Sequence, residues 1–322
     1  MDWQRLCTQL NLGDLLATPT PLTGGLMHKM YRLDTTTGRY ATKWLNPHIM
    51  RRPDAHHNFR QAEILEQKLE QAGLAILPAL TIGGKKMQEI DGQFVYVFPY
   101  FDGVALTDKP ITPRHCEQVG SLLAGIHNVD RREGIPSRAP LSLDWDALIR
   151  QATGNEAVHS LLVANREMLW EMQQQANRAL PHLPAEIAIC HNDMDPKNVL
   201  WREGECRAID LECLGYDSPG LELLETALCG AGYESGQVDY ARLTAFLRGY
   251  VAAGGILSTD WETLYHSNAG RLEWLAYNLR RALGEEGDDA RQLGMTEVEK
   301  TLVCISGYYR MKDHLLFALE SI

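Results

Sequence analysis

IAICHNDMDPKNVLWREGECRAIDLECLGYD, residues 187–217, is the stretch that decides the fold. An apolar run opens it, and two short β-like runs follow at Val199–Trp201 and Arg207–Ile209, with Gly204 between them. Short apolar runs on either side of a glycine turn predict a β-hairpin. Helical patterns flank this stretch on both sides, so the hairpin is expected to be embedded in a mostly helical region.

Polar residues lie at both ends of this hairpin. Asp193 and Asn198 precede its first strand, and Asp210 ends its second. Because the two ends of a hairpin meet, we expect these side chains to lie together. Phosphoryl transfer needs such a group, since a carboxylate must orient the attacking hydroxyl and oxygen ligands must hold Mg²⁺ against the phosphates. The alternative is a loop capped by Asp and Asn, which is where these residues commonly occur. The strands on both sides and the second Asp favour the functional interpretation.

The remaining sequence divides into two regions of different character. The first hundred residues alternate β-like runs with turns, and the part beyond Gly103 is dominated by helical periodicity. We therefore predict an α+β, bilobal fold like that of the protein kinases, with a β-rich N-terminal lobe at 1–98, a hinge at 99–104 and a helical lobe at 105–322. The expected strands are Met30–Leu33, Tyr40–Trp44 and Phe94–Phe98, and the expected helices are Asp54–Gly73, one starting at Thr112-Pro113, Glu156–Leu180 and several from Leu221 onward.

The motif HNDMDPKNVLW, followed by IDLE, resembles the catalytic and metal motifs of the aminoglycoside phosphotransferase and choline kinase group, which shares the protein-kinase fold. The resemblance implies Asp193 as catalytic base, Asn198 and Asp210 as Mg²⁺ ligands, and His191 as a buried scaffold of the loop. Glu212 stands where choline-kinase-like members also have a Glu. For Glu212 a structural hydrogen bond and a contact behind the metal ligands are both open.

The strand YATKW supplies Lys43, which the resemblance assigns to the α- and β-phosphates of ATP. Its expected partner is Glu63 on the helix that follows, with Glu66 and Glu70 as alternatives on nearby faces. A lone lysine in a strand is otherwise expected to be solvent-exposed. In the segment YDSPGLEL, Glu222 replaces the more usual Asp of the family and is interpreted as structural.

Two further segments are assigned to the nucleotide. TGGLMHKMY resembles the family's nucleotide-covering loop and provides Gly24 and Gly25, although a simple hairpin turn explains them equally well. FVYVFPYFDG resembles the segment joining the lobes, where Phe98 and Tyr100 are expected near the adenine. Pro99 has no N–H, so a neighbour must donate to the base. The chain contains no G-x-x-x-x-G-K-[ST] motif, which removes the other common ATP-binding design.

Charge suggests the kind of acceptor. The net charge is −11, and residues 201–322 carry 20 Asp or Glu against 11 Lys or Arg. A cleft of one sign concentrates ligands of the opposite sign, so we expect a cationic or amine-bearing acceptor. The segment RLEWLAYNLRRALG offers Glu273, Trp274 and Tyr277 as a carboxylate and aromatic faces for an ammonium group. The alternative is an ordinary helix with a leucine core face and a solvated acidic face.

These observations favour an enzyme, an ATP- and Mg²⁺-dependent kinase acting on an alcohol group of a small molecule. A protein kinase is disfavoured because no A-P-E motif follows Asp210. A non-catalytic nucleotide-binding protein of the same fold is a further alternative, and a metal-dependent hydrolase is disfavoured because His56-His57 lacks a carboxylate partner motif.

The chain lacks a basic patch, so neither nucleic acid nor membrane is an expected partner. The N-terminus lacks a signal-peptide pattern, and the seven cysteines contain no C-x-x-C pair. We therefore expect a cytoplasmic location. The identity of the acceptor, the choice between ATP and GTP and the oligomeric state stay open.

Overall fold

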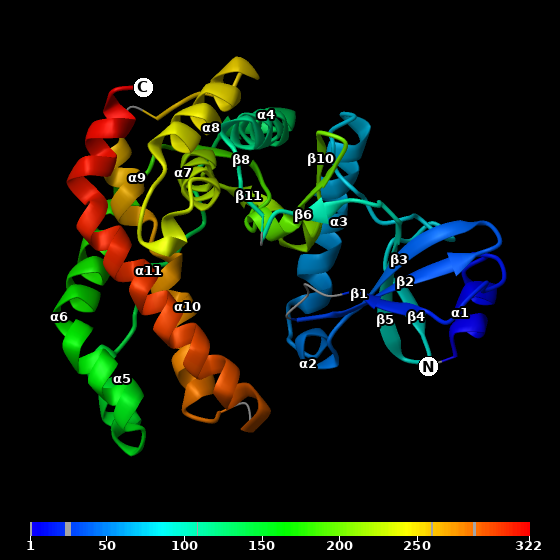
Figure 1. The fold of residues 1–322 in the computed structure, drawn as a ribbon, viewed down its shortest axis with the longest axis horizontal. Coiled ribbons are helices and arrows are strands. Elements are labelled where there is room, and N and C mark those ends of the chain that lie inside the picture. Colours follow the sequence, from blue (N-terminus) through cyan, green and yellow to red (C-terminus); the bar gives the residue numbers. More distant parts are fainter. Residues whose placement is uncertain (1, 23–26, 108, 259, 286–287) are drawn as a thin grey trace. The chain divides into compact units, whose positions relative to one another are not determined.

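The computed structural model describes residues 2–22, 27–107, 109–258, 260–285 and 288–322 (Figure 1). It divides into two compact units, each made of two stretches of chain. The first comprises Met1–Pro110 and His191–Gly215, and the second comprises Ile111–Cys190 and Tyr216–Ile322. The hairpin predicted to carry the chemistry therefore belongs to the same unit as the N-terminal strands.

The first unit contains a five-stranded antiparallel sheet in the order β1-β2-β3-β5-β4. The strands and helices predicted in this region are confirmed, with their ends shifted by a few residues. The elements of this first stretch are α1 (Trp3–Gln9), β1 (Thr20–Leu22), β2 (Lys29–Thr35), β3 (Gly38–Trp44), α2 (Pro47–Met50), α3 (Ala55–Gln71), β4 (Gln88–Ile90), β5 (Gln93–Pro99) and β6 (Val104–Ala105).

Alternation along β3 decides where Lys43 points. Successive side chains of a strand face opposite sides of a sheet. Trp44 packs with Leu6 of α1 and Val95 in one apolar cluster. Lys43 pairs in register with Tyr96, which belongs to a second cluster with Phe59 of α3. Lys43 therefore faces the α3 side of the sheet, and only 6% of its surface is exposed.

The hairpin is the predicted one and is tied to the chain that follows α3. β9 (Val199–Arg202) and β10 (Glu205–Ala208) pair antiparallel, and β6 adds a third strand beside β9. Ala208 exchanges backbone hydrogen bonds with Ala75 and Leu77, both 2.9 Å long. The predicted linker at 99–104 continues directly into β6, so the chain stays within the first unit up to Pro110. The remaining elements are two 3₁₀ turns, η3 (Pro196–Asn198) and η4 (Leu211–Cys213).

The second unit is mostly helical. The predicted start of α4 is confirmed, because Thr112 caps the helix and Pro113 is its first residue. Gly120 of α4 lies against the backbone of Phe246 in α8, where an added Cβ would come 2.1 Å from a carbonyl oxygen. The elements are α4 (Pro113–Val129), β7 (Arg131–Glu133), α5 (Trp145–Gln151), η1 (Ala152–Gly154), α6 (Glu156–Ala179), η2 (Leu180–His182), β8 (Glu186–Cys190), β11 (Gly215–Asp217), α7 (Pro219–Gly230), η5 (Tyr233–Ser235), α8 (Tyr240–Ala252), α9 (Trp261–Ser267), α10 (Gly270–Ala282) and α11 (Asp288–Glu320).

One apolar core joins α5, α6, α10 and α11, with Trp145, Leu162, Leu275 and Ile305 fully buried. Over the described ranges, no helix is both long and apolar enough to cross a lipid bilayer. All seven cysteines lie in the described ranges, and none of them forms a disulfide bond.

Candidate active site

The hairpin brings its two ends together as the sequence predicts. Its turn at Glu203-Gly204 has positive φ at both residues, 53° and 84°, the backbone that a tight two-residue hairpin requires. The Ile209 N–H donates to the Asn198 carbonyl over 2.9 Å. His191 is fully buried, and its Nε2–H donates to the Ile209 carbonyl over 2.9 Å. The loop before β9 is thus fixed to the end of β10.

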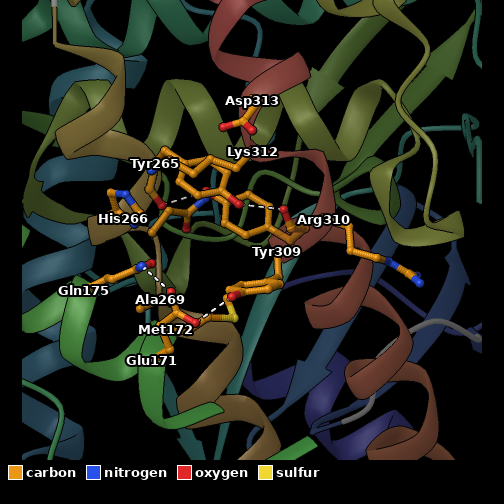
Figure 2. A pocket seen from close by; sticks show the side chains of 12 residues that line it. Glu171, Met172, Gln175, Tyr265, His266, Ala269, Tyr309, Arg310, Lys312 and Asp313 are labelled. Atoms are coloured by element: carbon orange, nitrogen blue, oxygen red, sulfur yellow. Dashed lines mark hydrogen bonds between the residues drawn. The ribbon is translucent and has the colours of Figure 1, made fainter. Parts of the chain in front are cut away.

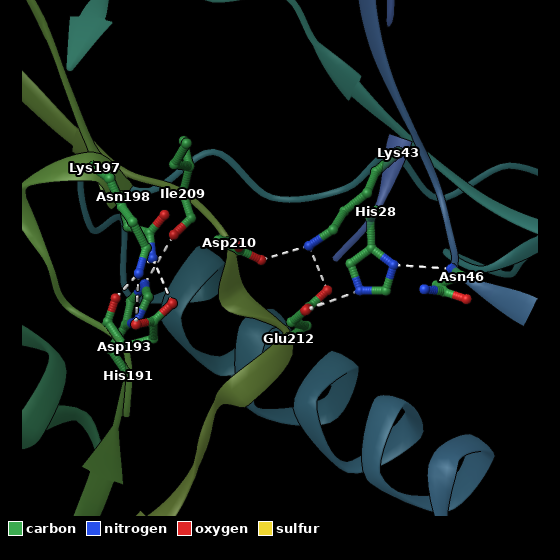
Figure 3. A network of polar contacts seen from close by, with 10 residues as sticks. All are labelled: His28, Lys43, Asn46, His191, Asp193, Lys197, Asn198, Ile209, Asp210 and Glu212. Atoms are coloured by element: carbon green, nitrogen blue, oxygen red, sulfur yellow. Dashed lines mark hydrogen bonds and ion pairs between the residues drawn. The ribbon is translucent and has the colours of Figure 1, made fainter. Parts of the chain in front are cut away.

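A first set of polar side chains lies in this loop, and we call Asp193, Lys197 and Asn198 the loop cluster (Figure 3). Asn198 donates through Nδ2 to both the carbonyl and Oδ2 of Asp193, each over 2.8 Å. Lys197 Nζ lies 3.2 Å from the other carboxylate oxygen, Oδ1. Both oxygens of Asp193 therefore have a donor. Burial raises the pKa of the Asp193 carboxyl, and the Lys197 ammonium works in the opposite direction.

A second set, the strand cluster, consists of His28, Lys43, Asp210 and Glu212 (Figure 3). The Lys43 ammonium donates to both Asp210 Oδ1 and Glu212 Oε2. Burial alone lowers the pKa of Lys43, but the two carboxylates outweigh it and raise the pKa above its usual value. Burial likewise raises the pKa of Glu212, but hydrogen bonding from His28 and the charge of Lys43 bring it down to about 2. Lys43 and Glu212 are therefore both ionised at neutral pH.

His28 is a member of this cluster that the sequence reasoning missed. The Asn46 N–H donates to its Nδ1 over 3.0 Å, so the ring proton is on Nε2. That nitrogen donates to Glu212 Oε1 over 3.1 Å. Glu212 thus receives hydrogen bonds from a strand lysine and from a histidine 184 residues away in sequence. No local pattern marks a pairing over such a distance.

The expected pair of Lys43 with Glu63 is wrong. Glu63 Oε1 accepts from the Tyr96 hydroxyl over 2.7 Å and from the Met87 N–H over 3.1 Å. The carboxylates that contact Lys43 are those of Asp210 and Glu212. Glu63 therefore takes its hydrogen bonds from Tyr96 and Met87 instead of from Lys43. Glu63 and Lys43 both line a cavity of about 20 Å³ in this unit, a space for little more than one water-sized group.

The two alternatives on α3 are engaged elsewhere as well. Glu66 is buried and accepts from Lys86 Nζ and from the Ala79 N–H, each over 2.6 Å. Glu70 contacts the same Lys86 over 3.2 Å. The carboxylates of this helix therefore anchor the segment that follows it, and Glu212 pairs with Lys43 in their place.

The residues predicted to contact the nucleotide differ in where the structure places them. Phe98 lines the small cavity beside Lys43. The Tyr100 N–H donates to the carbonyl of Arg39 in β3 over 3.0 Å, so this amide is hydrogen-bonded within the sheet. Gly24 and Gly25 lie outside the described residues.

The three residues predicted to meet the acceptor lie on α10 in the second unit. Glu273 is exposed, and Trp274 is 39% exposed. The rings of Trp274 and Tyr277 have centroids 5.6 Å apart, and the Arg281 guanidinium lies 5.4 Å from the centre of the Tyr277 ring. One aromatic face therefore already has a cation beside it. Their assignment to an acceptor stays a prediction.

The second unit has two further features with polar side chains, and the first surrounds Glu222. Glu222 accepts from His127 Nε2 over 2.8 Å, with Cys190 close by. Burial raises the pKa of the Cys190 thiol well above its usual value, and the other nitrogen of His127 contacts the Tyr250 hydroxyl over 2.7 Å. This group is a hydrogen-bonded core network, in keeping with a structural role for Glu222.

The second feature is a recess of about 260 Å³ among α6, α9 and α11 (Figure 2). Two of its lining residues are hydrogen-bonded to each other, since the Tyr309 hydroxyl donates to Glu171 over 2.6 Å. Its lining does not include Glu273, Trp274 or Tyr277. Its volume is below the range usual for ligand pockets, about 300–1,000 Å³.

A lysine on the third strand of an antiparallel sheet, with a loop Asp and Asn beside a second Asp, is the arrangement of the kinase-like phosphotransferases. A model of the phosphotransferase enzyme family (APH) matches residues 18–266 of this sequence. The chain belongs to this family.

Solved structures confirm the kinase-like fold. Spectinomycin phosphotransferase APH(9)-Ia, in complex with ADP and spectinomycin, has 15% identity, covers 95% of this chain and 98% of its own, and has a TM-score of 0.69. A choline/ethanolamine kinase family protein from Mesorhizobium loti has 16% identity, full coverage of both chains and a TM-score of 0.58. Amicoumacin kinase hAmiN, in complex with AMP-PNP, Ca²⁺ and Ami, has 13% identity, covers 94% and 93%, and has a TM-score of 0.61.

Proposed function

We propose that the protein is an ATP-dependent enzyme that transfers the γ-phosphate to a hydroxyl group of a small molecule. The observation that carries this proposal is the position of the Lys43–Asp210 pair in the same compact unit as the loop bearing Asp193 and Asn198. Membership of the phosphotransferase family supports the reaction type. Its similarity to a spectinomycin phosphotransferase and an amicoumacin kinase supports a small acceptor.

Asp193 is proposed as the base. The acceptor oxygen forms a bond to the γ-phosphorus, and the bond from that phosphorus to the bridging oxygen breaks. The electron pair of that bond leaves with ADP, and the hydroxyl proton passes to the Asp193 carboxylate. A pKa raised by burial makes a carboxylate a better proton acceptor. Asn198 holds the carboxylate in place through Oδ2.

Asn198 and Asp210 fit a hard divalent cation. Both amide hydrogens of Asn198 point to Asp193, which leaves Oδ1 as the group available to a metal. Asp210 contributes a carboxylate next to this loop, and oxygen ligands suit Mg²⁺. Mg²⁺ bound there would neutralise charge on the phosphates. The protein's own part is to hold these two oxygens at the joined ends of one hairpin.

Lys43 is proposed to bind the α- and β-phosphates. Its ammonium is oriented by Asp210 and Glu212, and Glu212 is itself held by His28. Glu212 thus takes the positioning role that a helix glutamate was expected to have. Phe98 and Tyr100 are proposed to lie near the adenine.

The acceptor is proposed to be cationic or to carry an amine, with Glu273, Trp274 and Tyr277 on its wall. The acidic excess of residues 201–322 supports the charge of the ligand. The exposed Glu273 and Trp274 support the choice of helix.

The test measures acceptor-dependent ADP release with Mg·ATP and a panel of amino alcohols, aminoglycosides, neutral sugars and hydroxy acids. The expected result is turnover with an amine-bearing alcohol and a higher KM for it in Glu273→Gln. A preference for a neutral or anionic acceptor would remove the charge assignment, and an unchanged KM would remove Glu273 alone. Nucleotide binding without turnover on any acceptor would favour the non-catalytic alternative.

A further inference from the structure

Lys197 is the charged group of the loop cluster to which the proposed function gives no role. It lies in the 3₁₀ turn directly before Asn198, and 40% of its side chain is exposed. Its ammonium lies 3.2 Å from Oδ1 of Asp193. Burial lowers its pKa, but the carboxylates of Asp193, Asp195 and Asp210 outweigh burial and raise it. A lysine side chain is protonated at neutral pH, so Lys197 is a cation next to the carboxylate of the proposed base.

The hydrogen bonds that close the turn do not use the side chain of Lys197. Asn198 fixes Asp193 by two hydrogen bonds. The turn is closed by backbone and side chain together, since the Asn198 N–H donates to the Asp195 carbonyl over 2.8 Å and Asp195 Oδ1 accepts from the Lys197 N–H over 2.9 Å. Neither of the bonds that close the turn uses the side chain of Lys197. Its ammonium contacts Asp193 Oδ1 instead.

The Lys197 ammonium lies within reach of the position that a transferred phosphoryl group is expected to occupy. A base lies about 2.6–3.2 Å from the hydroxyl that it deprotonates. That hydroxyl must in turn lie about 3–3.5 Å from the phosphorus that it attacks. Oxygens of the phosphoryl group therefore come within roughly 4–6 Å of Asp193, a space that Lys197 Nζ reaches from its present position.

Lys43 and Lys197 differ in their freedom to move. Lys43 is almost fully buried and pairs with two carboxylates. Lys197 pairs with one carboxylate, and its flexible four-carbon stem is partly exposed. A phosphate brought next to Asp193 can attract its ammonium by side-chain rotation alone.

We propose that Lys197 binds the γ-phosphoryl group of the bound nucleotide and neutralises its charge as it passes to the acceptor. This inference rests on the proposed function. Lys197 stays protonated throughout, because the hydroxyl proton goes to Asp193 and the bridging electron pair leaves with ADP. Cations fixed at the place where charge develops are a general means of stabilising phosphoryl transfer.

The experiment compares binding of Mg·ADP and Mg·AMP-PNP by calorimetry, because only the second ligand has a γ-phosphoryl group. Lys197→Met keeps the length of the side chain and removes its charge. We expect it to bind ADP like the wild type and AMP-PNP roughly 10- to 100-fold more weakly, the usual range for one charge-assisted hydrogen bond. Lys197→Arg should recover most of the difference.

Two controls frame this result. Lys43→Met should weaken both nucleotides, because Lys43 is assigned to phosphates that ADP also has. Lys85→Met removes an exposed lysine of the same unit and should change neither affinity. If Lys197→Met leaves the ratio of the two affinities unchanged while the wild type binds both, the inference is wrong and the proposed function stands. A wild type that binds neither nucleotide overturns the proposed function and the inference with it.

Discussion

The loop cluster and the strand cluster lie in one compact unit, yet they are built in opposite ways (Figure 3). The loop cluster is local: Asp193 and Asn198 are five residues apart, and Lys197 is four from Asp193. The strand cluster joins distant parts of the chain, since Lys43 meets Asp210 across 167 residues. The first can form once a single loop folds, whereas the second exists only when the sheet and the hairpin have come together.

Exposure differs in the same way. The side chains of Asp193 and Lys197 are 39% and 40% exposed, whereas that of Lys43 is 7% exposed. Lys197 is partly open and pairs with one carboxylate, so its ammonium can exchange that partner for a substrate. A buried, doubly paired lysine is pre-positioned instead. We therefore propose that the loop cluster serves bond making and that the strand cluster serves nucleotide binding.

The largest expected effect is a loss of kcat without a loss of nucleotide affinity. Asp193→Asn removes the proposed base and should lower kcat by about 10²–10⁴, the usual contribution of a positioned acid–base group. The affinity for AMP-PNP should change little, because the strand cluster is intact. Steady-state kinetics and calorimetry measure the two quantities.

Asp195→Asn is the matched control for this variant. It lies in the same loop, and its side-chain oxygen can still accept from the Lys197 N–H. Near-normal turnover in Asp193→Asn, or an equal loss in both variants, would remove Asp193 from the reaction.

The next effect concerns the Mg²⁺ dependence, because the proposed metal ligands Asn198 and Asp210 belong to different clusters. Asp210→Asn should raise the Mg²⁺ concentration needed for turnover and for AMP-PNP binding by at least about 10- to 100-fold, because even groups that only support a metal ligand commonly have an effect of this size. A Mg²⁺ titration of both quantities tests it. Unchanged Mg²⁺ dependence would place the metal elsewhere.

A smaller effect on nucleotide affinity is expected when a carboxylate partner of Lys43 is removed. Glu212→Gln leaves Lys43 with Asp210 as its one carboxylate partner, so nucleotide affinity should fall by roughly tenfold, the lower range for a hydrogen bond to a charged group. Glu63→Gln should change it less than about threefold, because a glutamine oxygen can still accept from the Tyr96 hydroxyl. The reverse order would restore Glu63 as the partner of Lys43.

The contrast between local and distant pairing also explains what the sequence could predict. The hairpin and the position of Asp193 beside Asn198 follow from short-range patterns and are confirmed. The two ends of the hairpin meet through the Ile209 N–H, one residue before Asp210, which donates to the Asn198 carbonyl. The main helices and strands followed from periodicity and turn residues in the same way, and α4 begins at its predicted cap.

The partner of Lys43 did not follow from such patterns. α3 presents three glutamates at similar spacing, and their partners are set by Tyr96, Met87 and Lys86 on other segments. His28 was missed for the same reason, since only the folded sheet brings it to Glu212. Pairings across more than a hundred residues depend on packing that a single sequence does not display.

We propose that this protein moves the γ-phosphoryl group of ATP to a small hydroxyl-bearing acceptor with Asp193 as base. The direct test follows a radiolabelled γ-phosphate after incubation with Mg²⁺ and the best acceptor of the panel. The account predicts that the label appears in the acceptor as a phosphate ester with the wild type and not with Asp193→Asn. Label that appears as inorganic phosphate alone, or in the acceptor equally with both proteins, would contradict it.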